Sequence, residues 1–144
     1  MNIAIASDHA GVDMKAELVN FIQGMGHQVR DFGPDTTDSV DYPDFAHPLA
    51  KAVEKGEFDL GFALCGSGNG INMTVNKHQG IRSALCWTVE ISKLAREHNN
   101  ANICAMPARF ISLDTAKEIT EVFLNTDFEG GRHERRVGKI ACGD

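Results

Sequence analysis

The sequence has little of what metal, redox and disulfide sites usually require. Its four cysteines lie far apart, at positions 65, 86, 104 and 142, and no CxxC pair occurs. Its six histidines form no HxH or HxxxH pair. Because zinc and dithiol sites depend on such spacing, the sequence argues against both, and a metal site would have to assemble from distant segments. The spacing alone does not exclude disulfides, but nothing else in the sequence indicates secretion.

Basic charge and long apolar runs are also scarce. The 144 residues include 14 Lys and Arg against 20 Asp and Glu, a net charge of −6. Phosphate backbones attract basic surfaces, so no nucleic-acid partner is expected. No apolar run approaches the roughly 20 residues of a membrane helix. The first three residues lead straight into a strand-like run, with no signal or transit segment expected, so we predict a cytoplasmic protein with no membrane partner.

Strand-like and helix-like segments alternate along a chain whose length suits one domain, residues 1–144. The expected strands span 2–7, 27–32, 58–64, 80–87 and 101–107, and the expected helices span 12–24, 44–55, 69–77, 88–99 and 113–126. This repeated β-α order predicts an α/β fold. We expect a three-layer, Rossmann-like sandwich around a five-stranded parallel sheet.

Ligands of such sheets bind beyond the carboxyl ends of the strands, and one of these ends carries CGSGNG at 65–70. The third glycine of a dinucleotide fingerprint would fall on Ile71, and no GxxxxGK is present, so a nicotinamide or ATP site has poor support. The glycines can still turn backbone N–H groups toward a phosphate or a developing oxyanion. The alternative is a plain tight turn between strand and helix.

Cys65 stands just before a predicted helix, where the helix dipole favours a thiolate. A buried structural thiol is the commoner role of cysteine, and Cys86 and Cys104 fit it because they fall within apolar strands. Cys65 fits that role poorly because it sits at the ligand-binding edge. It is therefore a candidate base or nucleophile.

Other polar residues with possible roles lie at separate places along the chain. Asp8 and His9 follow the first strand and could bind a sugar hydroxyl and an anion, or simply cap a helix. His98 ends a helix and could be a general acid, or a residue that only pairs with the helix dipole. The basic segment GGRHERRVGK at 130–139 is either a solvated tail or an anion site, since arginine forks fit phosphate oxygens.

Together these segments resemble the ribose 5-phosphate isomerase B family, which includes the galactose 6-phosphate isomerase subunits. The matching pieces, in order, are SDHAG (7–11), DYPDFA (41–46), CGSGNGI (65–71), NKxxGIR (76–82), REHNNAN (96–102), PAR (107–109) and FEGGRHERRV (128–137). They extend over nearly the whole chain. Ser67 stands where many members have threonine, which keeps the hydroxyl, and Ile71 stands where another branch has a catalytic glutamate.

The resemblance implies an aldose–ketose isomerase of a five-carbon sugar phosphate that uses no metal and no cofactor. It implies that Cys65 is the base, that Ser67 and the loop backbone stabilise an enediolate, and that His98, helped by Asp8, opens the sugar ring. The substrate-binding residues that it implies are Asp8, His9, Gly66, Ser67, Gly68, Asn69, Gly70, Asn99, Arg109, Arg132 and Arg136.

The resemblance also implies a homo-oligomer, a dimer or a tetramer, whose active site is shared between subunits. His98, Asn99 or Arg109 is expected to come from the second subunit, and the segment from about 127 to 144 is expected to contact it. The loop at 33–44 is the candidate for closure over substrate.

Three alternatives remain open at this level. The substrate could be a six-carbon sugar phosphate, allose 6-phosphate or galactose 6-phosphate. The chain could be a sugar-phosphate-binding module without catalysis. It could also, less readily, be a phosphatase with Cys65 as nucleophile, although the loop lacks the arginine that such enzymes carry.

Overall fold

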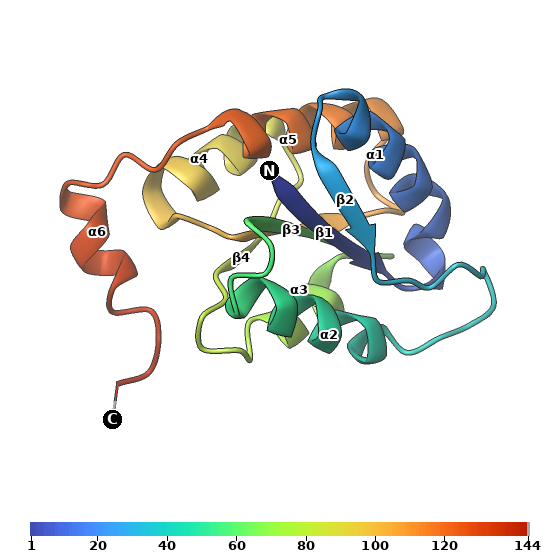
Figure 1. The fold of residues 1–144 in the computed structure, drawn as a ribbon, viewed down its shortest axis with the longest axis horizontal. Coiled ribbons are helices and arrows are strands. Elements are labelled where there is room, and N and C mark those ends of the chain that lie inside the picture. The colour runs from blue at the N-terminus through green and yellow to red at the C-terminus, as the bar shows by residue number, and fades with distance from the viewer. Residues whose placement is uncertain (144) are drawn as a thin grey trace.

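The protein, described for residues 1–143 by a computed structural model, is built on a parallel sheet of five strands (Figure 1). The sheet order is β2-β1-β3-β5-β4, and every ladder is parallel. The strands are β1 (Asn2–Ser7), β2 (Gln28–Asp31), β3 (Leu60–Cys65), β4 (Ser83–Leu85) and β5 (Ile103–Pro107). The predicted α/β fold with a five-stranded parallel sheet is confirmed.

Helices cover both faces of this sheet. The helices are α1 (Val12–Gly24), α2 (Tyr42–Glu54), α3 (Asn69–Val75), α4 (Val89–Asn99), α5 (Leu113–Asn125) and α6 (Arg132–Val137). In Figure 1, α1, α4 and α5 lie on one side of the sheet, and α2 and α3 lie on the other. The short α6 stands beside the end of α4, away from the sheet. It lies in the basic segment 130–139, for which the sequence left two interpretations, a solvated tail or an anion site.

The fourth strand is shorter than predicted, because side chains take over the backbone hydrogen bonds at its start. The Asn102 Oδ1 atom accepts from the Arg82 N–H at 2.8 Å, and the Asn76 Oδ1 atom accepts from the Ser83 N–H at 2.8 Å. Residues 80–82 therefore form a loop, and β4 begins at Ser83.

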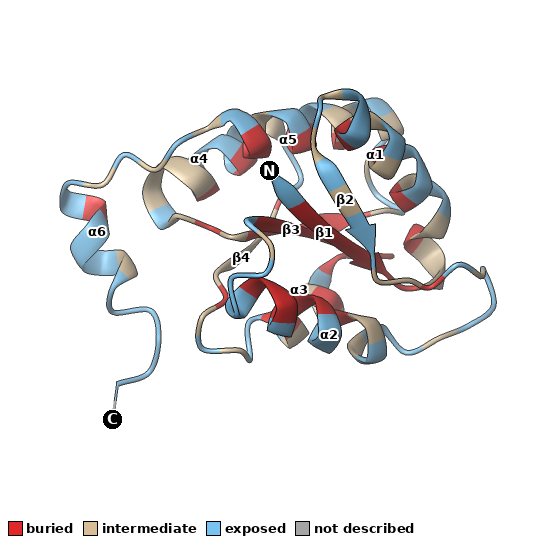
Figure 2. Ribbon diagram, in the orientation of Figure 1, coloured by how far each residue is buried: buried red, intermediate tan, exposed pale blue. Residues whose placement is uncertain are grey.

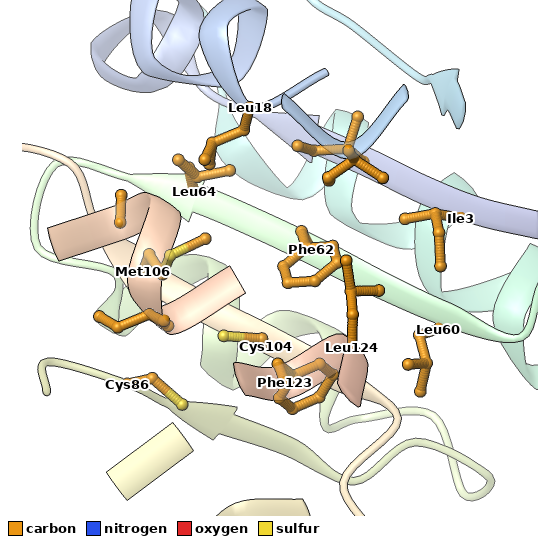
Figure 3. Packing of buried hydrophobic residues seen from close by; sticks show 14 of the residues in the cluster. Ile3, Leu18, Leu60, Phe62, Leu64, Cys86, Cys104, Met106, Phe123 and Leu124 are labelled. Carbon is orange, nitrogen blue, oxygen red and sulfur yellow. The ribbon is translucent and has the colours of Figure 1, made fainter. Parts of the chain in front are cut away.

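Each face of the sheet has its own hydrophobic core, and strand alternation assigns residues to the two cores. Large side chains such as Phe62 and Met106 pack under α1, α4 and α5, where the Phe62 and Phe123 rings meet edge to face with centroids 5.5 Å apart (Figure 3). Small residues such as Ala63 face α2 and α3. Figure 2 shows β1 and β3 buried along nearly their whole length. Cys65, the last residue of β3, belongs to the α2 and α3 side.

Strand register brings three chain segments to one edge of the sheet. Ser7 pairs with Leu64, and Cys65 pairs with Pro107, so β1, β3 and β5 end together. The Asp8 N–H donates to the Leu64 carbonyl at 3.0 Å, and the Ala108 N–H donates to the Cys65 carbonyl at 2.9 Å. The segments that follow these three strands are therefore neighbours.

The loop proposed to close over substrate is anchored at both ends. At its start, Lys15, which is 1% exposed, donates through Nζ to the Asp31 carboxylate at 2.7 Å and to the Pro34 carbonyl at 2.5 Å. At its end, the Val40 N–H donates to His9 Nδ1 at 3.1 Å. Residues 42–44, predicted as loop, form the first turn of α2. None of the helices in residues 1–143 is long and apolar enough to cross a membrane.

Candidate active site

The Cys65 sulfur lies at the mouth of the glycine loop and accepts a backbone hydrogen bond. The Gly68 N–H donates to Cys65 Sγ at 3.1 Å, and the Asn69 N–H donates to Ser67 Oγ at 3.2 Å. Cys65 is 4% exposed in the single chain. The loop thus directs an N–H group at the sulfur, an arrangement that stabilises negative charge there.

Gly68 gives this loop its shape because it adopts a left-handed conformation, with φ of 77°. We predict that Gly68→Ala lowers kcat by about 10²-fold, since small displacements of reacting groups are costly. An added Cβ would lie 2.5 Å from Leu85 Cδ1 and 3.1 Å from the Met106 carbonyl carbon, so the loop would have to move. Steady-state kinetics measures this effect. Gly24→Ala is the matched control, because a Cβ there meets nothing within 4 Å, and an equal loss in that variant would contradict the argument.

Asp8, His9 and Arg109 line an open cleft of about 530 Å³ beside this loop, together with residues 40–44. The Asp8 carboxylate caps the following turn by accepting from the Ala10 N–H at 2.9 Å. His9 Nδ1 accepts from Val40, so in the neutral ring the proton sits on Nε2, which is then a donor. Such a cleft combines a carboxylate, an imidazole donor and a guanidinium, which suits a polyhydroxylated anion.

Arg109, one of three residues expected from a second subunit, lies beside the glycine loop of its own chain. Its N–H donates to the Gly66 carbonyl at 3.0 Å, and a Cβ built on Gly66 would lie 3.2 Å from Arg109 Nη1. The cause is the sheet order, which places β5 beside β3. The structure thus brings Arg109 to the Cys65 loop of its own chain.

His98 and Asn99 lie at the other edge of the sheet. Helix α4 starts after the carboxyl end of β4 and runs back for 11 residues, or about 16 Å. Asn100 then takes a left-handed conformation, with φ of 45°, and β5 begins at Ile103. The structure thus separates His98 and Asn99 from the Cys65 loop of the same chain.

The basic C-terminal residues gather near His98. The His133 ring stacks on the His98 ring with centroids 4.2 Å apart, and Arg132 and Arg136 are exposed on the same short helix. Sequence reasoning missed His133 and Glu129, although the i,i+4 spacing of this pair was a signal. It also gave no role to Tyr42, whose ring covers Gly70 so closely that an added Cβ would lie 2.5 Å from Cζ.

Cys86 and Cys104 belong neither to the Cys65 loop nor to the residues gathered near His98. Burial raises the pKa of Cys104 well above its ordinary value, and the neighbouring Cys86 thiol raises it further. Both side chains are fully buried, as predicted for structural thiols. All four cysteines lie within the described residues and are free.

Arg96 fixes the end of α4 where His98 sits. It donates to the Thr126 carbonyl at 3.2 Å and to the Ala101 carbonyl at 2.5 Å. These bonds join α4 to the end of α5 and to the residues that lead into β5. Burial lowers the pKa of Arg96, and a neighbouring carboxylate, Asp127, offsets part of this. The arginine of the REHNNAN motif thus has a structural role.

Comparison with known proteins gives one consistent result. Residues 3–140 match the family model described as Ribose/Galactose Isomerase. The chain is 44% identical to the putative sugar phosphate isomerase YwlF of Bacillus subtilis, over 98% of this chain and 95% of that protein. It is 39% identical to the D-erythrulose-4-phosphate isomerase of Pectobacterium atrosepticum, over 97% and 93%.

Solved structures agree. The ribose-5-phosphate isomerase B of Clostridium thermocellum superposes with a TM-score of 0.96 at 46% identity, over 97% of this chain and 95% of that chain. The Mycoplasma genitalium ribose-5-phosphate isomerase B, solved with bound ribulose-5-phosphate, superposes with a TM-score of 0.93 at 40% identity, over 96% and 93%.

Proposed function

Since the chain belongs to the ribose/galactose isomerase family and is a sugar-phosphate isomerase, we propose that it interconverts ribose 5-phosphate and ribulose 5-phosphate. The observation that carries this proposal is the Cys65 sulfur held against the Gly68 N–H at the edge where β1, β3 and β5 end. The likeness to an isomerase solved with bound ribulose-5-phosphate supports the choice of substrate. Membership of an isomerase family argues against a non-catalytic binding module and against a phosphatase.

In the proposed reaction Cys65 acts as the base. Its thiolate takes the proton from carbon 2 of the open-chain aldose, and an enediolate forms as the carbonyl oxygen on carbon 1 gains negative charge. The thiol exchanges its proton with solvent while the enediolate is bound and then delivers a proton to carbon 1, as the hydroxyl proton passes from oxygen 2 to oxygen 1. Backbone N–H groups of Gly66–Gly70 and the Ser67 hydroxyl stabilise the developing oxyanion. No metal or cofactor enters this sequence of steps.

The complete site in this proposal is formed by two copies of the chain. One copy supplies Cys65, Asp8, His9 and Arg109, and the other supplies His98 for ring opening, Asn99, and Arg132 and Arg136 for the phosphate. The separation of His98 from Cys65 at opposite edges of one chain supports this. The segment from about 127 to 144 is then the part of the single domain that contacts the second copy.

Exposed apolar side chains supply a surface for this association. Trp87 and Phe110 stack with ring centroids 5.9 Å apart, and they are 44% and 63% exposed in the single chain. Ile91 and Leu94 on α4 are exposed as well. Exposed apolar groups of this size are typical of surfaces that are covered in an assembly.

A substrate comparison in metal-chelating buffer tests the function. We expect ribose 5-phosphate to give the highest kcat/KM among ribose 5-phosphate, D-erythrulose 4-phosphate, allose 6-phosphate and galactose 6-phosphate. In D₂O, deuterium should enter the product at the carbon that receives the proton. If ribose 5-phosphate ranks last, the substrate assignment is wrong. If no substrate exchanges its proton with solvent, the base mechanism is wrong.

A further inference from the structure

Three side chains of the kinds that bind metals lie close together at the amino edge of the sheet. Of the three, the proposed reaction uses only His98. They are His98, Glu129 and His133, and one ligand atom of each lies within 4.8 Å of the others. The Glu129 Oε2 atom is 3.4 Å from His133 Nε2, and the two imidazole rings stack at an angle of 15°. These three residues come from the end of α4, the loop between α5 and α6, and α6 itself.

The backbone holds the three side chains together. The Glu129 N–H donates to the Glu97 carbonyl at 3.1 Å, which fixes the loop on the end of α4. Gly130 and Gly131 have φ of +68° and +55°, and this turn begins α6 so that His133 packs inward at 7% exposure. The Glu129 side chain is half exposed and can rotate toward a cation. The fold thus brings the three side chains together. Because the lone pairs of two stacked rings do not point at one common atom, the half-buried His98 ring has to turn out of the stack to bind the same ion as His133.

We propose that His98, Glu129 and His133 bind a divalent transition metal of the zinc type, and that binding inhibits the enzyme. Two imidazoles and one carboxylate are a known zinc donor set that leaves a fourth position for water. Bond lengths of about 2.0–2.1 Å place tetrahedral donors about 3.3 Å apart, so ligand atoms that lie up to 4.8 Å from one another must approach by up to about 1.5 Å.

Inhibition is expected because metal binding and proton transfer need the same lone pair of His98. This part rests on the proposed function. A metal bound to the His98 nitrogen occupies the electron pair that would carry a proton in ring opening, and any proton on that nitrogen leaves to solvent. The exposed arginines of α6 oppose cation binding, while the negative charge of the Glu129 carboxylate favours it. Zinc would thus act on His98 and leave the fold intact.

A second pair of histidines with a nearby glutamate provides a control, because its donor atoms do not point at one common position. His47 Nδ1 lies 2.8 Å from His78 Nε2, and the other nitrogen of His78 lies 3.4 Å from Glu54. Here His78 stands between its two partners, so the three donors form a chain and do not surround one point. Histidine and glutamate content is the same in the two groups, and only the geometry differs.

Titration with Co²⁺, followed by visible absorption, tests the metal site on the full chain. Nitrogen and oxygen ligands give visible bands without the near-ultraviolet band of a cobalt–thiolate bond, which distinguishes this site from Cys65 and Cys142. We expect Glu129→Gln and His133→Asn to weaken Co²⁺ binding by about 10–100-fold or more, and His78→Asn to leave it unchanged. Equal binding by all four proteins, no binding, or a thiolate band alone would overturn the site.

Zinc inhibition tests the regulatory part. We expect the protein to be active in chelating buffer, to lose activity with Zn²⁺, and to need about 10-fold more Zn²⁺ for the same loss in the Glu129→Gln variant. Inhibition of that variant at the same Zn²⁺ concentration as the wild type would place the effect elsewhere and refute the proposal. Absence of isomerase activity in chelating buffer would instead refute the proposed function, while the cobalt spectra would still decide the metal site.

Discussion

Cys65→Ala is expected to lower kcat for ribose 5-phosphate isomerisation by about 10²–10⁴-fold, the range of a positioned general base. Ile71 stands where a carboxylate would have to be, and the Ser67 hydroxyl is far less acidic than a thiol. No neighbour in the loop can therefore replace the sulfur as the base. The phosphate-binding groups are untouched, so substrate affinity should change little. Steady-state kinetics and incorporation of deuterium from D₂O both measure this loss. Residual exchange at the wild-type rate would refute Cys65 as the base.

The buried position of Cys65 calls for a control on stability. Cys86→Ala removes a sulfur that is equally buried but lies outside the loop, so it should cost a similar free energy of unfolding, about 1 kcal/mol, and retain activity. Cys142→Ser removes an exposed thiol and should change neither. If Cys86→Ala loses as much activity as Cys65→Ala, the effect of the latter is one of folding and not of chemistry.

The fold was predictable because strands and helices alternate with clear periodicity. Each of the five predicted strands and five predicted long helices has a counterpart. Thr88, at the predicted start of the 88–99 helix, caps α4 by accepting from the Ile91 N–H at 3.2 Å. The errors lie where side chains replace backbone pairing, as at Asn76 and Asn102 beside β4. The helix α6 has only six residues, too few for periodicity to reveal it.

The site was predictable only in part. The rule that ligands bind at the carboxyl ends of strands correctly grouped Asp8, Cys65 and Arg109, because it needs only the order of elements. The same rule does not say which strands are neighbours, and the contact of Arg109 with Gly66 depends on the sheet order that places β5 beside β3. The contact of His98 with His133 depends on a turn at Gly130 and Gly131 that carries no signal in the strand and helix pattern.

Mixing two inactive variants is expected to restore activity, because the proposed site takes Cys65 from one copy and His98 from another. Cys65→Ala and His98→Asn should each be nearly inactive with ribose 5-phosphate, whose ring must open. After subunit exchange at equal concentrations, half of the dimers are mixed, and each has one site with both residues intact. About a quarter of the wild-type activity should return, since both sites of a symmetric dimer are equivalent. The rate after exchange, compared with the two unmixed proteins, measures it.

A second mixture provides the control, because Arg109 lies on the same side as Cys65 within one chain. In a mixed dimer of Cys65→Ala and Arg109→Ala, each site contains one of the two defects, so no site is intact. This mixture should show no gain over the average of its parents. Equal recovery in both mixtures, or none in the first once exchange is demonstrated by mass spectrometry, would contradict the shared site. His98 would then have to act within its own chain, although α4 carries it away from the edge of the sheet where Cys65 lies.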